Sequence, residues 1–372
     1  MSERGELTPP YPAGTRQRPT MRDVAALARV SLKTVSRVIN GEPTVAAELA
    51  SRVHRAAATL DYRPNLTARS LRSSDGRTRT IGVLLEDVAN PFSSALYRAV
   101  EDIASSRGVA VFAGSLDEDP VRERTLALAL AARGVDGLII VPAGDDQSYL
   151  ATEQRSGLSL VFADRPPRLL RADAVVSDNA GGAYEAARHL IAAGHRRIGF
   201  LSDFSQIPTA ADRFAGYARA LSGAGIELDD ELVRRELHNT ESAQAATREI
   251  MEGPRPTALF PTQNLITIGV IRALRAIKLH ERVAVIGFDD IPLADLLQPA
   301  VSVIAQDPAG IGAKACEILL RRMDGDPSPA QTHTIATRLI ARGSGEIPPG
   351  IPAGRGPVPD EEAHPVRRGR PR

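Results

Sequence analysis

The side chains best suited to chemistry lie in one short stretch of this 372-residue chain, between Thr20 and Asn40. Lys33 and Arg37 are accompanied there by hydroxyl side chains and by one apolar residue, Leu32. Ammonium and guanidinium groups bind phosphate oxygens and guanine edges, hydroxyls bind phosphates, and an apolar side chain can contact a thymine methyl group. The combination predicts a surface that contacts DNA.

Two short helices joined by a tight turn would place these groups on one surface. Thr20 and Asp23 form a Thr-x-x-Asp start signal for the first helix, and Ser31 is a candidate N-cap for a second helix that runs to Asn40. The residues at helical spacing that would face inward are Val24, Ala25, Leu27, Ala28, Val35, Val38 and Ile39. An ordinary helical hairpin is the alternative, because short helix pairs are common in unrelated proteins.

A third helix and a short linker helix follow. Residues 45–60 carry Leu49, Val53, Ala56 and Leu60 at helical spacing, which would close a three-helix core. The pattern then breaks, and residues 66–71, LTARSL, could form one further short helix. Six residues gain too few hydrogen bonds to offset the cost of nucleation, so this helix would need a partner in order to form.

The segments DVAALARVSLKTVSRVIN and YRPNLTARSL resemble the headpiece and hinge of the lactose-repressor/galactose-repressor (LacI/GalR) family of bacterial transcriptional regulators. The resemblance also extends from Ile81 to Ser344. It implies a dimeric, ligand-responsive repressor that binds a roughly palindromic operator, with a pair of Leu71 side chains wedged into the central minor groove. The residues expected to contact DNA are Thr20, Ser31, Leu32, Lys33, Thr34, Ser36, Arg37, Asn40, Asn65, Ala68, Arg69 and Leu71.

From Thr80 onward, short Val/Ile/Leu-rich runs such as IGVLLED, VDGLIIVP and VAVIGFDD alternate with helical segments such as ALYRAVEDIASSRG. This alternation predicts doubly wound α/β layers that bind ligands outside the carboxyl ends of the strands, although the spacing alone leaves open one sheet or two. The resemblance implies a periplasmic-binding-protein-like core of two doubly wound subdomains, crossed by the chain three times, behind the all-α helix-turn-helix headpiece and its hinge helix.

We therefore expect a disordered arm at 1–19, the headpiece at 20–64, the hinge helix and linker at 65–79, the core at 80–343 and a disordered basic tail at 344–372. Within the core, the first subdomain would comprise about 80–176 and 307–336, and the second about 177–304 and 337–343. The tail contains Arg368-Gly369-Arg370-Pro371, which resembles an AT-hook core, although a nonspecific basic tail is the safer interpretation. No heptad repeat follows the core, so no tetramer-forming coiled coil is expected.

Polar side chains at the predicted strand ends would face a ligand. By resemblance, the best matched ligand contacts are Arg213, Asp289 and Gln306, followed by Asp87, Phe92, Arg165 and Gln263. Guanidinium forks and carboxylates suit a hydroxylated or charged small molecule, and an aromatic ring can stack on it. A sugar or related polyol is the favoured effector, and a nucleobase or nucleoside acting as corepressor is the alternative. Helix capping is the competing role for such residues, above all for Asp178 and Asn179.

Three departures limit what the resemblance transfers. Arg29 stands where the family usually has glycine, which would cost about 1 kcal/mol if the backbone there is left-handed. Ala46 and Leu49 replace a serine and a threonine that usually contact phosphate. Gln263-Asn264 replaces a usual Asn-Asp pair, which removes a carboxylate from the cleft.

Composition and motifs argue against the competing classes of protein. The net charge is only +1, but the first eighty residues are rich in arginine. We find no phosphate-binding loop, no Gly-x-Ser-x-Gly elbow and no metal-ligand spacing, so we expect no enzyme activity, cofactor or metal. His195 is expected to be structural, and the single cysteine, Cys316, to pack in the core. Without an apolar signal segment, a cytoplasmic, nucleoid-associated protein is expected rather than a transport-type binding protein or a membrane partner.

Overall fold

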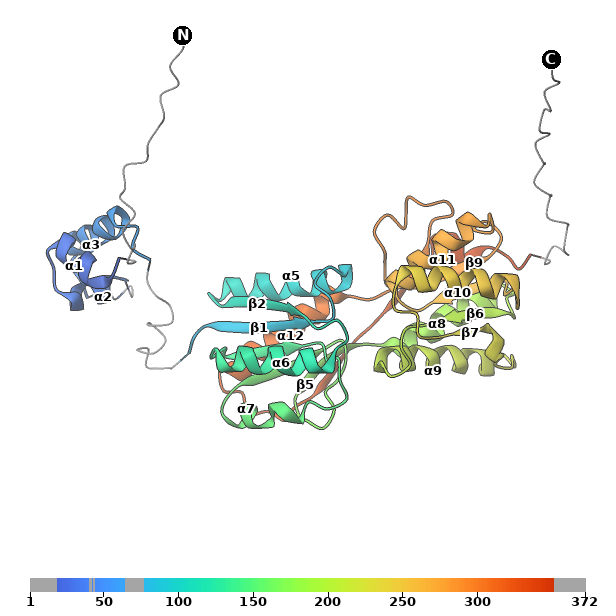
Figure 1. The fold of residues 1–372 in the computed structure, drawn as a ribbon, viewed down its shortest axis with the longest axis horizontal. Coiled ribbons are helices and arrows are strands. Elements are labelled where there is room, and N and C mark those ends of the chain that lie inside the picture. Colours follow the sequence, from blue (N-terminus) through green and yellow to red (C-terminus); the bar gives the residue numbers. More distant parts are fainter. Residues whose placement is uncertain (1–18, 40–41, 43, 64–76, 351–372) are drawn as a thin grey trace, which may run out of the picture. The chain divides into compact units, whose positions relative to one another are not determined.

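A computed structural model describes residues 19–39, 42, 44–63 and 77–350 (Figure 1). The chain divides into two compact units, of which the first extends to Thr78 and the second begins at Arg79. Several predictions lie outside the described residues: the N-terminal arm before residue 19, the DNA contacts Asn40, Asn65, Ala68, Arg69 and Leu71, and the AT-hook-like end of the tail.

Three helices form the first unit: α1 (Met21–Ala28), α2 (Leu32–Ile39) and α3 (Ala47–Thr59). At the start of α1, the Asp23 carboxylate accepts hydrogen bonds from the amide (2.7 Å) and the hydroxyl (2.8 Å) of Thr20. At the start of α2, the Ser31 hydroxyl accepts one from the Thr34 amide at 3.0 Å. Both predicted start signals are therefore confirmed. Leu27 is 50% exposed, contrary to its predicted inward position, because the core side of α1 consists of other residues, Val24, Ala25 and Ala28.

The turn between α1 and α2 has a left-handed backbone. Arg29 adopts φ 52° and ψ 50°, the conformation for which glycine carries no steric cost. From α3, the Arg52 guanidinium donates hydrogen bonds to the carbonyls of Ala28 (2.6 Å) and Arg29 (3.1 Å). Because the last carbonyls of a helix lack partners within the helix, Arg52 satisfies two groups that the end of α1 leaves open.

The second unit contains two six-stranded sheets, with the orders β11-β5-β4-β3-β1-β2 and β12-β10-β9-β8-β6-β7. The first sheet consists of β1 (Thr80–Leu85), β2 (Ala110–Ser115), β3 (Gly137–Ile140), β4 (Ser159–Ala163), β5 (Asp173–Ser177) and β11 (Thr332–Ile335). The second consists of β6 (Ile198–Leu201), β7 (Val233–Arg234), β8 (Ala258–Pro261), β9 (Ala284–Phe288), β10 (Ser302–Ala305) and β12 (Arg338–Ile340). All pairs are parallel except β10 with β12, which confirms the prediction of two doubly wound subdomains.

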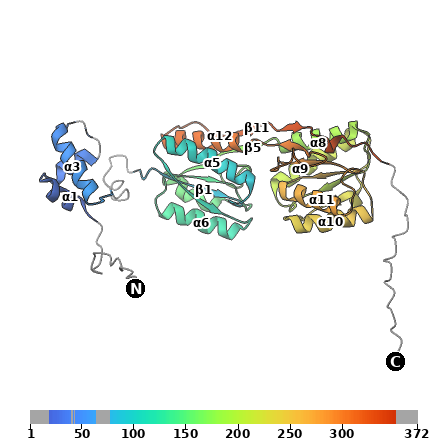
Figure 2. The ribbon, with the colours of Figure 1, turned by 90° about the horizontal axis from the view of Figure 1, so that it is seen from above.

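Helices cover both faces of each sheet (Figures 1 and 2). In the first subdomain, α5 (Pro91–Ser106) and α12 (Pro308–Met323) pack together on one face, and α6 (Pro120–Ala132) and the short η1 (Ser148–Leu150) and α7 (Ala151–Arg155) lie on the other. In the second, α8 (Asn179–Ala192) pairs with α9 (Pro208–Gly223), and α10 (Thr240–Glu252) pairs with α11 (Asn264–Ala276). Two further 3-10 turns are η2 (Asp230–Leu232) and η3 (Ser344–Glu346).

The chain passes between the two sheets three times. The crossings lie between β5 and α8, between β10 and α12, and between β11 and β12. Asp178 caps α8 by accepting the Gly181 amide at 2.8 Å, as the capping alternative predicted. The carboxyl ends of β1, β4, β6, β8 and β9 lead into the loops between the sheets, so these loops are where a site can form.

Residues 344–350 belong to the second subdomain, so the predicted start of the tail at Ser344 is wrong. The Ser344 hydroxyl donates to the Val285 carbonyl at 2.6 Å and accepts from the Ser302 amide at 2.8 Å. A Cβ atom on Gly345 would lie 2.7 Å from Ile286, so only glycine fits there. Small residues in this segment fill a tight space against the sheet, although their composition is that of a linker.

Two sequence predictions about single side chains agree with the structure. Cys316 is fully buried among the apolar residues under the first sheet. His195 is also fully buried, and its ring nitrogens lie 2.8 Å from the Thr257 hydroxyl and 2.8 Å from the Ile347 carbonyl. Burial lowers the pKa of His195, which suits a neutral, structural ring. Among the described residues, no helix is both long enough and apolar enough to span a bilayer.

Candidate functional site

The outward surface of α2 carries the residues predicted to contact DNA. Leu32 is 44% exposed, and Lys33 beside it is exposed. Arg37, one turn further on, keeps 44% of its side chain exposed and lies 3.4 Å from the carboxylate of Glu42. Val35 and Val38 are buried on the opposite side of the helix, so α2 presents its cations outward. Its predicted apolar side is thus confirmed.

The hydroxyl residues of this surface cluster at helix starts. Ser31 and Thr34 share a side-chain hydrogen bond of 2.9 Å at the beginning of α2, and Thr20 is exposed at the beginning of α1. The first amides of a helix point away from the helix and attract anions. This surface can therefore offer phosphate oxygens both hydroxyl and amide donors beside Lys33.

The second candidate region is a cavity between the two sheets. Its lining residues are mostly polar and come from both subdomains: Glu86, Asn90, Phe92, Asp164, Arg165, Asp203, Ile207, Thr209, Ala210, Arg213, Thr262, Gln263, Asp289 and Gln306. This cavity has about 40 Å³ of free space, and a second hollow of about 340 Å³ shares Arg165 and Ile207 with its lining. A hollow of about 440 Å³ beside α9 and η2 is larger, but its arginines lie on the surface, whereas the cavity between the sheets is lined by the buried Arg165, Arg213, Asp164 and Asp289.

Arg213 and Asp289 face this cavity from the second subdomain. Arg213 is 6% exposed, donates to the Asn179 side chain (2.8 Å) and the Thr262 carbonyl (2.6 Å), and stacks 3.9 Å above the Phe288 ring. Burial lowers the pKa of Arg213, and the nearby carboxylates oppose that effect. Gln306 donates to the Asp289 carboxylate at 2.5 Å. The structure therefore brings the three best matched residues into one lining.

Arg165 lines the cavity but is already paired with an acid. Its two terminal nitrogens lie 2.7 Å and 2.6 Å from the two carboxylate oxygens of Glu118, and both side chains are less than 10% exposed. Burial alone would lower the pKa of Arg165, but the hydrogen bonds and charge of Glu118 outweigh it and raise that pKa. This fork-to-fork pair fixes the guanidinium before any ligand arrives.

The structure puts Glu86, and not its neighbour Asp87, in the lining. Asp87 accepts a hydrogen bond from the Ala89 amide at 2.9 Å and so shapes the turn before α5. Within the described part of the chain, the Glu86 carboxylate accepts one hydrogen bond, a 3.4 Å contact from the side-chain amide of Asn90. Asp87, a predicted ligand contact, therefore lies outside this lining, because its carboxylate binds the Ala89 amide in the turn after β1.

Two further predicted residues lie in the lining with different surroundings. Gln263 caps α11, since its side-chain oxygen accepts from the amides of Leu265 (2.9 Å) and Ile266 (3.2 Å). Phe92 is partly buried at the start of α5. Asn264 donates to Asn90 at 2.8 Å, which joins the two subdomains across the cavity.

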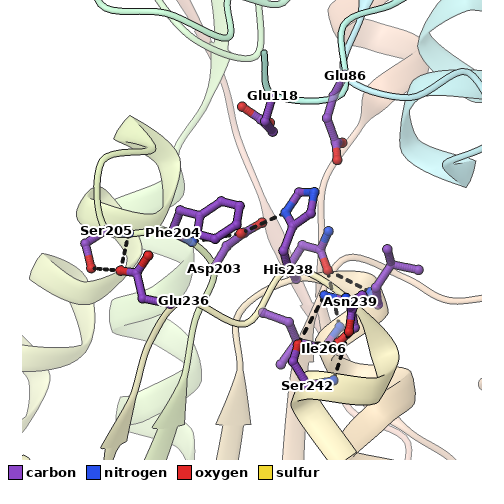
Figure 3. A network of polar contacts seen from close by, with 12 residues as sticks. Glu86, Glu118, Asp203, Phe204, Ser205, Glu236, His238, Asn239, Ser242 and Ile266 are labelled. Atoms are coloured by element: carbon purple, nitrogen blue, oxygen red, sulfur yellow. Dashed lines mark hydrogen bonds and ion pairs between the residues drawn. The ribbon is translucent and has the colours of Figure 1, made fainter. Parts of the chain in front are cut away.

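The far wall contains residues that sequence reasoning missed. His238 donates from Nδ1 to Asp203 at 3.0 Å, and its ring stacks on Phe204 with 4.9 Å between the centroids (Figure 3). The hydrogen bond to Asp203 raises the pKa of His238 against the effect of burial. Glu86 and Glu118 extend from the other subdomain toward this wall (Figure 3).

The signal for some of these residues was present in the sequence. Asp203 follows a predicted strand, RRIGFLS, as the other strand-end acids do. His238 follows no strand-end pattern, and its contact with Asp203 joins residues 35 apart, so periodicity could not reveal it. Among the described residues, no group of three His, Cys, Asp or Glu side chains is arranged to hold a metal ion.

A three-helix unit with cations on an outward helix, joined in one chain to two doubly wound subdomains around a polar cavity, defines a class of protein: the DNA-binding regulators with a periplasmic-binding-protein-like core. Two family models match this chain. Residues 20–65 match "Bacterial regulatory proteins, lacI family", and residues 187–345 match "Periplasmic binding protein-like domain".

Relatives that align with most of the chain support the same family as these two models. The chain is 32% identical over 328 residues to the ribose operon repressor of Haemophilus influenzae, covering 87% of this chain and 98% of that protein. Its structure resembles a lac repressor dimer bound to operator and the anti-inducer ONPF, with TM-score 0.79, 26% identity, and coverage of 88% and 99%. It also resembles a complex of the transcriptional regulator CelR with cellobiose, with TM-score 0.65, 30% identity, and coverage of 88% and 100%. The chain belongs to the LacI family of DNA-binding transcriptional repressors.

Proposed function

We propose that this protein is a cytoplasmic, dimeric repressor that binds a roughly palindromic operator and changes its operator affinity when a small molecule occupies the cavity between its subdomains. The observation that carries the proposal is that one chain holds both an outward row of cations on α2 and a polar cavity lined by both subdomains. A sugar or related polyol is the proposed effector, in keeping with the relatives named for ribose and found with cellobiose.

Such regulation needs two states of the core, and a cavity with walls from two subdomains allows them. Its walls belong to different sheets, and the Asn90–Asn264 hydrogen bond of 2.8 Å joins them through side chains alone. A ligand that contacts both walls stabilises whichever separation of the subdomains gives it more contacts. Because the coupling between two sites is reciprocal, operator binding then changes effector affinity by the same factor.

Selection from random DNA duplexes tests the DNA part of the proposal. The full chain should enrich an inverted repeat, since two-fold symmetric dimers read two half-sites about one helical turn apart. The Arg37→Ala protein serves as the matched control and should enrich the repeat weakly, with one base position relaxed. Enrichment of no repeat by the unchanged protein contradicts the proposal.

A thermal-shift screen of sugars and polyols tests the effector part, since a ligand that binds only the folded core raises its melting midpoint. Each compound that shifts the midpoint is then added to the protein on its selected duplex, and the operator affinity is measured by fluorescence anisotropy. A change in operator affinity that Asp289→Asn abolishes supports the proposal. Binding that leaves operator affinity unchanged contradicts it.

A further inference from the structure

The cavity contains more acidic than basic groups. The carboxylates that line or face it belong to Glu86, Glu118, Asp164, Asp203 and Asp289, whereas the basic groups are Arg165, Arg213 and His238. Carboxylates that are ionised and buried need a cation or several donors close by, because burial removes the water that otherwise solvates them. The partners of each acid therefore indicate what a ligand must supply.

Most of these acids are already partnered by the protein. Glu118 forms the two-pronged pair with Arg165, and Asp164 lies 3.4 Å from the Nε atom of Arg165. Asp203 accepts from His238 and from the Phe204 amide (2.7 Å). Asp289 accepts from Gln306. The guanidinium of Arg165 thus already pairs with two carboxylates of the described residues, although its buried Nε atom has no hydrogen-bond partner, so an anionic ligand would compete with Glu118 and Asp164 for it.

Glu86 differs from the other acids. Its carboxylate accepts the long 3.4 Å hydrogen bond from Asn90, and it forms no ion pair shorter than 4.0 Å within the described residues. The charged groups that act on it are Glu118 and Asp203, which repel its negative charge, and Arg165 and His238, which attract it. Burial, followed by the charge of Glu118, raises the pKa of Glu86 to about 7. The protein itself compensates this carboxylate poorly.

We propose that the effector carries a positively charged amino group that pairs with Glu86, so that the favoured ligands are amino derivatives of a sugar or polyol. This inference rests on the proposed function, because it names the ligand class of the same cavity. The hydroxyl groups of such a ligand would meet Asp289, Gln306 and Arg213, and its ammonium group would lie beside the Glu86 carboxylate, which extends into the space between the subdomains (Figure 3). A phosphorylated sugar would instead place its charge beside an acid.

The experiment uses the full chain and four matched forms of D-glucose, D-galactose and D-mannose: the free sugar, the 2-amino sugar, its N-acetyl derivative and the 6-phosphate. Affinity is measured by calorimetry at fixed ionic strength. At least one amino sugar should bind about tenfold or more tighter than its three counterparts, since loss of a buried charge pair costs at least that factor. The N-acetyl form is the closest control, because it keeps the nitrogen but removes its charge.

Two variants and a pH series complete the test. Glu86→Gln should reduce amino-sugar binding to the level of the free sugar, and Asp87→Asn, which changes the adjacent carboxylate outside the lining, should leave it unchanged. An ammonium group holds Glu86 ionised, so binding releases a proton near neutral pH and affinity should rise from pH 6 to pH 7.5. If Glu86 instead binds as a neutral acid that donates a hydrogen bond, Glu86→Gln retains affinity and affinity falls over that range; either result overturns the inference.

The outcomes separate the inference from the proposed function. Tighter binding of a free, N-acetylated or phosphorylated sugar, or binding of no amino sugar, overturns the amino-group assignment. If such a competing sugar also changes operator affinity, the proposed function stands without the assignment. An amino sugar that binds through Glu86 but leaves operator affinity unchanged supports the assignment and contradicts the proposed regulation.

Discussion

The α2 surface and the cavity place their cations in opposite environments. Arg37 is 44% exposed and lies near a single half-exposed acid, Glu42. Arg165 and Arg213 are each 6% exposed and are held by several protein acceptors. Exposed cations remain available to a large polyanion and are screened by salt, whereas buried cations are fixed before binding and resist screening. The two regions therefore use arginine for attraction in one case and for a preformed shape in the other.

The largest expected effect tests whether the buried Arg165–Glu118 ion pair stabilises the core. Glu118→Gln removes the two-pronged acid partner of the buried Arg165 and leaves only the Asp164 carboxylate, 3.4 Å from its Nε atom, so it should lower the free energy of unfolding of the core by about 3 kcal/mol. The matched control is Asp117→Asn, because Asp117 pairs with Arg122 at 2.8 Å but both side chains are about half exposed. That change should cost about 0 to 1 kcal/mol. Equal costs in urea unfolding would remove the distinction between the two environments.

The next effect concerns effector binding by the cavity. Asp289→Asn keeps the size of the side chain and suits the positive φ of 72°, but removes the charge that faces Arg213 and Gln306. It should weaken effector binding by about 2 to 5 kcal/mol and abolish the effector response on operator DNA. Asp290→Asn is the control, since Asp290 pairs with Arg342 at 2.7 Å outside the cavity lining. A full effector response in Asp289→Asn would place the site elsewhere.

A smaller loss, of affinity for operator DNA, is expected from substitutions on the exposed surface of α2. Arg37→Ala should weaken binding to the selected duplex by about 1 to 3 kcal/mol and relax one base position. Glu42→Gln should strengthen binding a few-fold, because the acid 3.4 Å from Arg37 competes with DNA for that side chain. Anisotropy titrations on selected and random duplexes at one salt concentration measure both. Unchanged affinity and sequence preference in Arg37→Ala would contradict this role.

The pH dependence should have opposite signs in the two regions. The pKa of Glu86 is raised to about 7, so its contribution to stability is complete below its ordinary value of 4.5 and is lost as pH rises toward 7. The pKa of Asp23 is lowered by the hydrogen bonds from Thr20, so its contribution is present at neutral pH and is lost as pH falls below 3.8. The free energy of unfolding is measured against pH for both variants. Glu86→Gln should lack the fall in stability as pH rises toward 7, and Asp23→Asn should lack the fall in stability below pH 3.8. A Glu86→Gln curve with the original slope would contradict the burial of that carboxylate.

The smallest effect concerns the turn before α2. Arg29→Gly should stabilise the first unit by about 1 kcal/mol, because glycine adopts the left-handed backbone of Arg29 at no steric cost. Arg29→Ala removes the long side chain but keeps a Cβ atom in the left-handed backbone. The difference in stability between the two variants therefore measures the free-energy cost of that backbone conformation. Amide hydrogen exchange of the full chain reports the stability of α1 to α3 separately. Equal protection in both variants would show that the backbone costs nothing there.

The same contrast explains what the sequence could predict. The outward residues of α2 follow from helical phase, because a short helix on a small core has one side left for solvent. Strand ends could also be located, but the pairing of the side chains there could not. Glu118, Asp164 and Asp289 all have positive φ, and the Arg165–Glu118 pair joins residues 47 apart. Such loop conformations aim side chains in directions that hydropathy does not encode, so the sequence did not predict the Arg165–Glu118 pair.

The three crossings of the chain set an order for folding during synthesis. The first sheet needs β11, which ends at Ile335, and the second needs β12 and the segment around Ser344. Neither subdomain is therefore a continuous stretch that can finish while the ribosome makes the other. The three-helix unit has no such requirement, since its elements end at Thr59. A nascent chain would hold a finished DNA-contacting unit long before its core can bind an effector, and the core would complete both halves almost together, once β11 and β12 have been made.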